Sequence, residues 1–177
     1  AIMAKLRNSA AAGKLDLTLR ALAHKGGNVN FIKDDKDSDG EAILHLAAAA
    51  GSSTMIEFLA RKGADFDVRT SELQRTPLMC AAKAGKVDAT MTLLENGSMR
   101  HMDAVDIHGW TALHHAAANG TPELVTVLLM CGANAYKRNE RGLIPLDEAM
   151  AVGRMNVVEA IRCYKVPDLA FRLQLAF

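Results

Sequence analysis

Apolar residues recur along this chain as pairs of short runs with helical spacing. One run, Ala42–Ala50, is followed by a turn glycine and then by a second run, Met55–Ala60. Apolar residues three and four positions apart lie on one face of a helix, because a helical turn takes 3.6 residues. Each pair of runs therefore predicts two short helices joined by a tight turn.

The paired runs repeat with a period of just over 30 residues. The turn glycines Gly51, Gly85, Gly120 and Gly153 stand 34, 35 and 33 residues apart. Self-similarity at such a period is typical of stacked repeats, in which each unit buries an apolar face against the next. We predict one domain over 5–164, with repeats at about 5–36, 37–70, 71–105, 106–138 and 139–164.

An apolar tail, 165–177, follows the last predicted repeat. Leu169, Leu173 and Phe177 share one helical face, so the tail could dock on the open side of that repeat and shield it from water. The alternative is that the tail begins a further domain. The sequence leaves both interpretations open.

Two threonine–proline pairs mark helix starts. Thr76 precedes Pro77, and Thr121 precedes Pro122. A threonine hydroxyl can accept a hydrogen bond from a first-turn amide, and proline fits the first helical position because its missing N–H has no partner there. We predict Thr76 and Thr121 as the N-caps of a first and a second helix of their repeats.

Each unit is ordered as a glycine, a Thr-Pro-Leu-His-like box, Ala-Ala, a second glycine, a Leu-Leu run and Gly-Ala. This order resembles the ankyrin repeat, and it is clearest over 40–63, 76–97 and 109–133. The resemblance implies an all-α solenoid of stacked antiparallel helix pairs, from which β-hairpin-like loops project. It also implies end repeats that are degenerate.

Several positions depart from the ankyrin pattern. Met79 replaces the box histidine, Gln74 replaces the hairpin glycine, and Asp147 stands where His45 and His114 do in their repeats. The resemblance implies that those two histidines bond backbone groups of neighbouring repeats. It also implies that Asp147 belongs to a terminal repeat.

The overall composition predicts a globular chain whose net charge is close to zero. Lys and Arg number 21 and Asp and Glu 20, which leaves a net charge of +1 and no bulk attraction to nucleic acid or to anionic membrane. No window approaches the roughly 18 uninterrupted apolar residues of a membrane span, and the start lacks a secretory pattern. We expect no nucleic-acid partner, no direct membrane insertion and a cytoplasmic or nuclear location, with the chain able to be part of a larger protein.

Candidate chemistry is sparse. Asp35, Asp37 and Asp39 match the start of a calcium loop, but Leu46 stands where the final bidentate carboxylate is needed. A calcium-responsive binder is therefore the least favoured of three hypotheses. The three cysteines are odd in number and widely spaced, which argues against a disulfide framework and a paired metal site. No phosphate loop, nucleophile elbow or zinc motif occurs, so we predict no enzyme, cofactor or metal.

The resemblance implies a protein or peptide partner, because ankyrin proteins usually bind through hairpin tips and the exposed side of the inner helices. Trp110 is the only tryptophan, and tryptophan and arginine are enriched in binding hot spots. The alternative for Trp110 is that its ring packs on the next hairpin. The predicted partner-binding residues are Glu41, Leu73, Arg75, Lys83, Ile107, His108, Trp110, Asn119, Arg141 and Leu143.

Two function hypotheses remain besides the calcium-responsive binder. The first is a non-catalytic protein–protein interaction module. The second is an inhibitor or regulator of an enzyme such as a protein kinase, since the chain is similar in size to the ankyrin-type inhibitors of cyclin-dependent kinases.

Overall fold

The computed structural model describes residues 41–164. The first predicted repeat (5–36), the aspartates of the tested calcium loop and the tail 165–177 lie outside the described residues, as do the predictions made for them.

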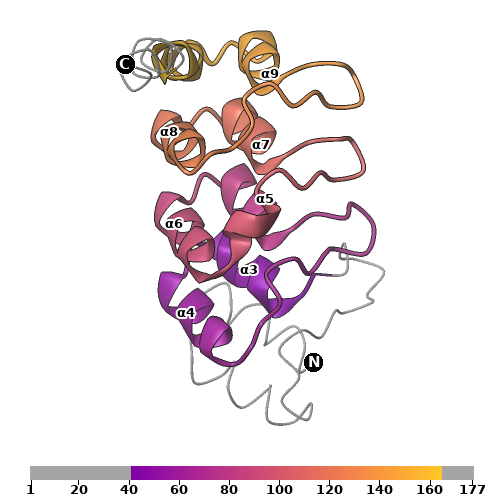
Figure 1. Cartoon of the computed structure of the whole chain (residues 1–177), viewed down its shortest axis with the longest axis vertical. Helices are drawn as coiled ribbons and strands as arrows, with labels where there is room; N and C mark the ends of the chain where they lie inside the picture. The colour runs from indigo at the N-terminus through magenta and orange to yellow at the C-terminus, as the bar shows by residue number, and fades with distance from the viewer. Residues whose placement is uncertain (1–40, 165–177) are drawn as a thin grey trace, which may run out of the picture.

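The described chain is a stack of antiparallel helix pairs, and each pair has an inner and an outer member (Figure 1). The inner helices are α3 (Ile43–Ala50), α5 (Pro77–Lys83), α7 (Ala112–Asn119) and α9 (Pro145–Ala151). The outer helices are α4 (Ser53–Arg61), α6 (Val87–Asn96), α8 (Pro122–Met130) and residues 155–164. A 3-10 helix, η1 (Ser98–His101), follows α6.

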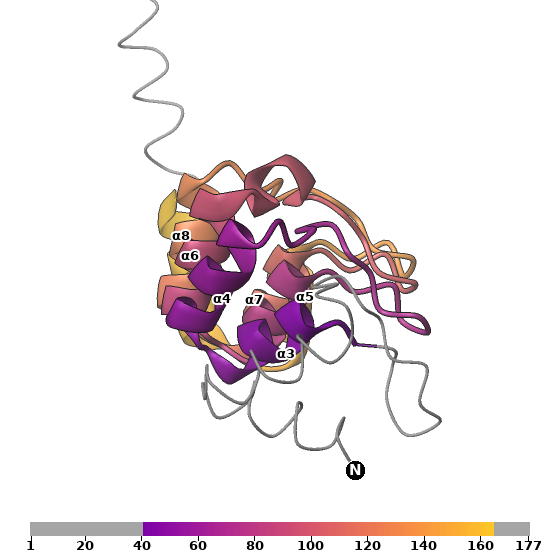
Figure 2. The ribbon, with the colours of Figure 1, turned by 90° about the horizontal axis from the view of Figure 1, so that it is seen from below.

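The helices form two layers. Successive inner helices contact one another, as do α4, α6 and α8. Figure 2 shows the two layers end on, with the hairpin loops that precede the inner helices projecting to one side. The predicted all-α solenoid of stacked helix pairs is confirmed over 41–164.

Alanine pairs set the spacing of the inner layer. Small side chains let neighbouring helices approach closely while still filling the space between them. Leucines behind them fill the space between the layers, and each fully buried leucine stabilises the fold by about 1.5–3 kcal/mol. The residues with no exposed surface include Ala47, Ala48, Ala81, Ala82, Ala116, Ala117, Leu59, Leu93 and Leu128.

One of the two predicted capping hydrogen bonds forms. The hydroxyl of Thr76 accepts a hydrogen bond from the Met79 amide at 3.3 Å, as predicted. Thr121 is the N-cap residue of α8, as predicted, but its hydroxyl accepts no hydrogen bond from the first turn. It donates to Asn119 Oδ1 at 2.6 Å, two residues away in the turn before α8.

The hairpin loops are closed by backbone hydrogen bonds. Thr70 N donates to Arg75 O, and Asp106 N donates to Trp110 O, both at 3.0 Å. Gln74, which replaces the hairpin glycine, has φ +54°, a left-handed conformation that glycine adopts more easily. Its side-chain amide donates to the carbonyls of Thr70 and Ser71, which offsets part of that strain.

Candidate functional site

The box histidines bridge successive repeats. His45 Nδ1 accepts from Ala42 N at 3.1 Å, and its Nε2 lies 2.9 Å from Arg75 O in the next hairpin. Because Nδ1 accepts, the proton sits on Nε2, which donates across the junction. The bridging role that the resemblance implied for this histidine is confirmed.

His114 repeats the arrangement one junction later. Its Nδ1 lies 3.2 Å from Thr111 N, and its Nε2 lies 3.1 Å from Leu143 O. Burial lowers the pKa of His114, so the ring stays neutral in the folded chain. This neutral ring is a structural bridge and leaves neither nitrogen for catalysis.

The two departures from histidine behave differently. Met79 is 1% exposed and contributes only packing at its junction. Asp147 Oδ2 accepts from Ile144 N at 3.0 Å, so it caps its own helix. Asp147 thus makes the hydrogen bond to its own repeat that the histidines make through Nδ1. Its side chain is too short to make the second bond, to a neighbouring repeat, that they make through Nε2.

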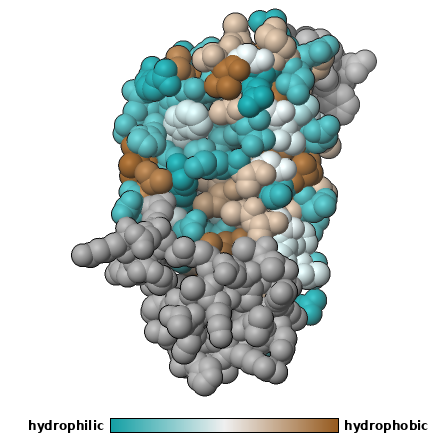
Figure 3. Space-filling view, turned by 180° about the vertical axis from the view of Figure 1, so that it is seen from behind, coloured by the Kyte–Doolittle hydropathy of each residue, from teal (hydrophilic) through white to brown (hydrophobic). Residues whose placement is uncertain are grey.

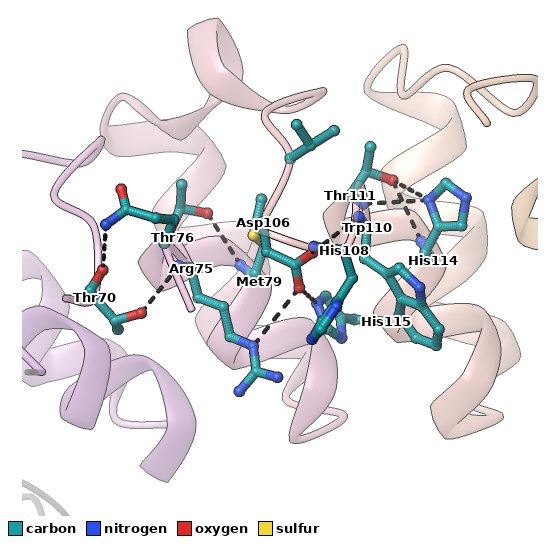
Figure 4. A network of polar contacts seen from close by, with 12 residues as sticks. Thr70, Arg75, Thr76, Met79, Asp106, His108, Trp110, Thr111, His114 and His115 are labelled. Atoms are coloured by element: carbon teal, nitrogen blue, oxygen red, sulfur yellow. Dashed lines mark hydrogen bonds and ion pairs between the residues drawn. The ribbon is translucent and has the colours of Figure 1, made fainter. Parts of the chain in front are cut away.

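Asp106 is the centre of a polar cluster at the start of the fourth hairpin loop (Figure 4). Its side chain has no exposed surface. Oδ1 accepts from the amides of His108 at 2.9 Å and Trp110 at 3.0 Å, and Oδ2 lies 3.0 Å from Nε2 of His115. The carboxylate therefore holds the hairpin turn and ties it to α7.

Hydrogen bonding decides the charges in this cluster. Burial alone would raise the pKa of Asp106, but the hydrogen bonds from His115 and from the two amides outweigh it and hold that pKa below its usual value. Burial also lowers the pKa of His115. At neutral pH a neutral imidazole thus donates to a charged carboxylate.

Arg75 approaches the same carboxylate from the preceding hairpin loop. Its Nε lies 3.8 Å from Asp106 Oδ2, which is an ion-pair distance but too long for a hydrogen bond. Only 17% of the Arg75 side chain is exposed, and Nε is buried without a hydrogen-bond partner. The predicted contact residue is therefore largely enclosed, because it pairs with a buried carboxylate of the next repeat.

Trp110 lies over the histidines of α7. The centroid of its ring is 5.0 Å from that of His115 and 6.0 Å from that of His114. The ring is half-buried. Trp110 thus packs on the helix of its own repeat (Figure 4), and the residue stays partly exposed.

The fifth repeat has a contact between hairpin and helix equivalent to that of Asp106 and His115, but its carboxylate, Glu148, comes from the helix. Asn139 Oδ1 accepts from the amides of Arg141 and Leu143, both at 3.0 Å, and its Nδ2 donates to Glu148 Oε1 at 2.7 Å. Arg141 Nη1 lies 3.6 Å from the same Glu148 oxygen. Here the carboxylate comes from the helix and the amide from the hairpin.

The remaining predicted contact residues lie on the hairpin loops and inner helices, a surface we call the inner face. Asn119 also has a structural contact, since its Nδ2 donates to Lys83 O at 2.9 Å and joins two successive repeats. Lys83, Ile107, His108, Asn119 and Arg141 are exposed, and Glu41, Leu73 and Leu143 are partly buried.

Hydrophobic side chains do not form one continuous patch on the rear surface of the stack. Figure 3 shows that surface with the hairpin loops on its left, and its brown residues are scattered among hydrophilic and weakly apolar ones. A polar depression lined by Glu57, Ala60, Arg61 and Asn96 lies on the outer helices instead.

Sequence reasoning did not find the contact between Asp106 and His115. The available signal was a spacing: the bonded residues are nine positions apart in the fourth repeat, and so are Asn139 and Glu148 in the fifth. Two polar residues at the same separation in successive repeats indicate a contact between hairpin and helix.

Residues 41–164 contain neither a cluster of metal ligands nor a membrane-spanning helix. No group of three or more histidine, cysteine, aspartate or glutamate side chains there could hold a metal ion. In the same part of the chain, no helix is both long and apolar enough to cross a membrane.

A family profile described as ankyrin repeats in three copies matches residues 6–103, 68–139 and 99–168. Among similar proteins, tyrosine-protein kinase HTK16 of Hydra vulgaris is 31% identical over 127 residues, which cover 72% of this chain and 17% of the kinase.

Ankyrin repeat and SOCS box protein 3 of Bos taurus is 35% identical over 133 residues, which cover 72% of this chain and 24% of that protein. Human transient receptor potential cation channel subfamily A member 1 is 32% identical, over 72% of this chain and 11% of the channel. The chain thus spans less than a quarter of each of these three relatives.

Proposed function

Because the chain belongs to the ankyrin repeat family, we propose that it binds a protein partner through its hairpin loops and inner helices, without catalysis. Ankyrin repeats are protein–protein interaction modules, and they are generally non-catalytic. In the relatives named as a kinase and a channel, the matching region covers a small part of the protein. The proposal therefore concerns this domain and leaves any activity to other parts of a longer protein.

One observation carries the proposal: within 41–164 the buried side-chain nitrogens and oxygens other than Arg75 Nε and Ser98 Oγ are hydrogen-bonded, while the hairpin tips present exposed side chains. Ile107, at the tip of the fourth hairpin, is 43% exposed, and Arg141, in the fifth, has 69% of its side chain exposed. Residues that contribute little to the fold yet project from a rigid scaffold are suited to contact a partner.

Affinity capture with the intact chain, followed by mass spectrometry, tests the proposal. The inner-face variant is Ile107→Ala, and the matched control is Met130→Ala, which removes an apolar side chain 72% exposed at the end of an outer helix. We expect a captured protein to be lost or strongly reduced with the first variant and retained with the second. Equal capture by both variants would contradict binding through the inner face.

An enzyme regulator is a special case of the same proposal. Capture of a protein kinase, followed by inhibition of that kinase by the purified chain, would support it. Capture of non-enzymes alone would exclude it.

A further inference from the structure

The inner and outer helices differ in the charges that they expose. The outer helices carry more acidic than basic side chains. Their exposed acids are Glu57, Asp88, Glu95, Glu123 and Glu159, and their exposed cations are Arg61, Lys62 at the end of α4, and Arg162.

On the inner helices the acids are used internally. Glu148 is 3% exposed and bonded to Asn139, and Asp147 is bonded to a backbone amide. Lys83 is exposed, as are Lys86 and Arg154 in the turns that follow α5 and α9. Lys83 is the exposed charged residue of the inner helices over 41–164, while the hairpin loops beside them expose both signs, including Glu72 and Glu140. The positive charge that favours an acidic partner is therefore local to Arg75 and Lys83.

Arg75 is a cation on this face with a buried N–H donor, Nε, that has no hydrogen-bond partner. Both oxygens of Asp106 have closer donors, at 2.9–3.0 Å, so Arg75 keeps only an ion pair at 3.8 Å. Its Nε is buried and has no hydrogen-bond partner. A guanidinium carries five N–H donors in a fixed fork, and at least this donor of Arg75 has no acceptor.

The surroundings of Arg75 define the ligand. Arg75 Nε and His115 Nε2 both lie on Asp106 Oδ2, at 3.8 Å and 3.0 Å. The Lys83 carbonyl accepts a hydrogen bond from Asn119 on α7, the helix that carries His115. Trp110 lies on the ring of His115 at 5.0 Å. Figure 4 shows Arg75 and Trp110 extending on either side of His115. Arg75 and Trp110 thus both lie next to His115, and Lys83 belongs to α5, which packs against the helix of His115.

We propose that the inner-face site, defined as Arg75, Lys83 and Trp110, binds the carboxylate of an aspartate or glutamate in an extended peptide segment of the protein partner. An apolar residue of that segment would lie on Trp110. A guanidinium fork matches the two oxygens of a carboxylate, and burial limits the side-chain entropy that Arg75 loses on binding. This inference rests on the proposed function and adds the chemistry of the ligand.

A peptide selection tests it. A random phage-displayed peptide library is selected against the intact 177-residue chain. The selected sequences are then synthesised and titrated while the fluorescence of Trp110, the only tryptophan, is followed. We expect enrichment of aspartate or glutamate beside an apolar residue, and loss of binding when that acid is replaced by its amide.

Three arginine and lysine variants locate the site. Arg75→Gln and Lys83→Gln should each weaken binding about tenfold or more, because each removes a charge that faces the ligand. Arg61→Gln is the matched control, since it makes the same change on outer helix α4, where 79% of the arginine side chain is exposed, and it should leave affinity unchanged. Variant titrations follow an anisotropy label on the peptide, and circular dichroism checks the fold. Lys83→Gln keeps the test valid if Arg75→Gln unfolds the chain.

Several outcomes would overturn the inference. They are selected peptides without acidic enrichment, affinity unchanged by both Arg75→Gln and Lys83→Gln, binding of phosphorylated peptides only, or no selected peptide at all. In each case the proposed function still stands if the capture experiment with Ile107→Ala gives its expected result. Failure of that capture experiment would instead remove the proposed function.

Discussion

The junction between the third and fourth repeats and the junction between the fourth and fifth use equivalent positions but different polar links. At the later junction, His114 reaches Leu143 O at 3.1 Å. At the earlier one, Met79 stands in place of that histidine, and Arg75 approaches Asp106 at 3.8 Å instead. Both junctions thus have a polar side-chain link between neighbouring repeats. At the later junction a helix residue supplies it, and at the earlier one a hairpin residue does.

Both junctions share a backbone contact between hairpin loops. Ile107 N donates to Leu73 O at 3.2 Å, and Glu140 N donates to His108 O at 3.1 Å. This common contact fixes how closely the loops approach. The histidine bridge and the arginine pair are then additions to the same frame, and their separate contributions can be measured.

The largest effect should come from a side chain that separates the hairpins at the later junction. A Cβ at Gly109 would lie 2.8 Å from Glu140 N, whereas one at Gly142 would meet no atom within 4 Å. Both glycines have left-handed φ, +72° and +76°, so alanine costs each about 1–2 kcal/mol in backbone strain. We expect Gly109→Ala to lose a further ~1–3 kcal/mol from the clash.

Urea unfolding of the two glycine variants measures the difference. Gly142→Ala is the control for the strain that both share. Equal losses of unfolding free energy would show that the loops move apart without cost, and that their contact does not fix the junction.

Next in size is the conversion of the later junction into the earlier one. His114→Met introduces the side chain that Met79 has at the earlier junction. It fills a similar volume but leaves Leu143 O and Thr111 N without their histidine partners. Leaving a buried polar group unsatisfied costs about 1–3 kcal/mol, so we expect a loss of roughly that size. Chemical denaturation measures it, and a loss below about 0.5 kcal/mol would show that the bridge does not stabilise the stack.

A smaller effect should come from acid, which should lower the unfolding free energy below pH 6.5 through the two histidines of the fourth repeat. The pKa values of His114 and His115 are lowered from 6.5, chiefly by burial, so between the folded pKa and 6.5 the unfolded chain binds more protons. Their contribution is therefore complete above pH 6.5 and is lost as the pH falls, by at most about 1.4 kcal/mol per pH unit for each ring. Asp106 has a pKa lowered from 3.8 and adds a further loss only below that value.

The unfolding free energy between about pH 7.5 and about pH 5 measures this dependence. His114→Met should show a shallower slope than the parent chain, because one of the two rings is gone. An unchanged slope would assign the dependence to other groups.

The smallest effect should come from giving the earlier junction the histidine of the later one. Met79→His places a donor opposite the Trp110 carbonyl, in the position from which His114 reaches Leu143. A gained hydrogen bond adds about 0.5–1.5 kcal/mol, from which the lost methionine packing is subtracted. We expect a change within about 1 kcal/mol of zero, and a large loss would show that the two junctions differ in backbone spacing.

Much of the fold could be predicted because the helices, turns and caps of each repeat depend on residues close together in the sequence. The Ala-Ala pairs, the turn glycines and the box at Thr76 fix helix length, turn and cap within about ten residues. The capping hydrogen bond missing at Thr121 was not predictable in the same way, because the hydroxyl also has the Asn119 carboxamide within reach and donates to it.

Less of the candidate site could be predicted. The position of Trp110 next to the hairpin turn followed from the repeat, but its packing on His115 did not, because that contact depends on how the hairpin loop folds back onto α7. Likewise Arg75 was assigned to the surface by its register. Its enclosure arises from Asp106, which belongs to the next repeat.

The number of residues per repeat, the helix pairs over the described chain and the roles of His45 and His114 could be read from the sequence, because these depend on spacing and on contacts that repeats make alike. Which charges are satisfied inside the stack and which remain outside depends on how the repeats pack together. That outcome depends on distances between residues of different repeats, such as the 3.8 Å from Arg75 to Asp106, which stacking sets and no single repeat contains.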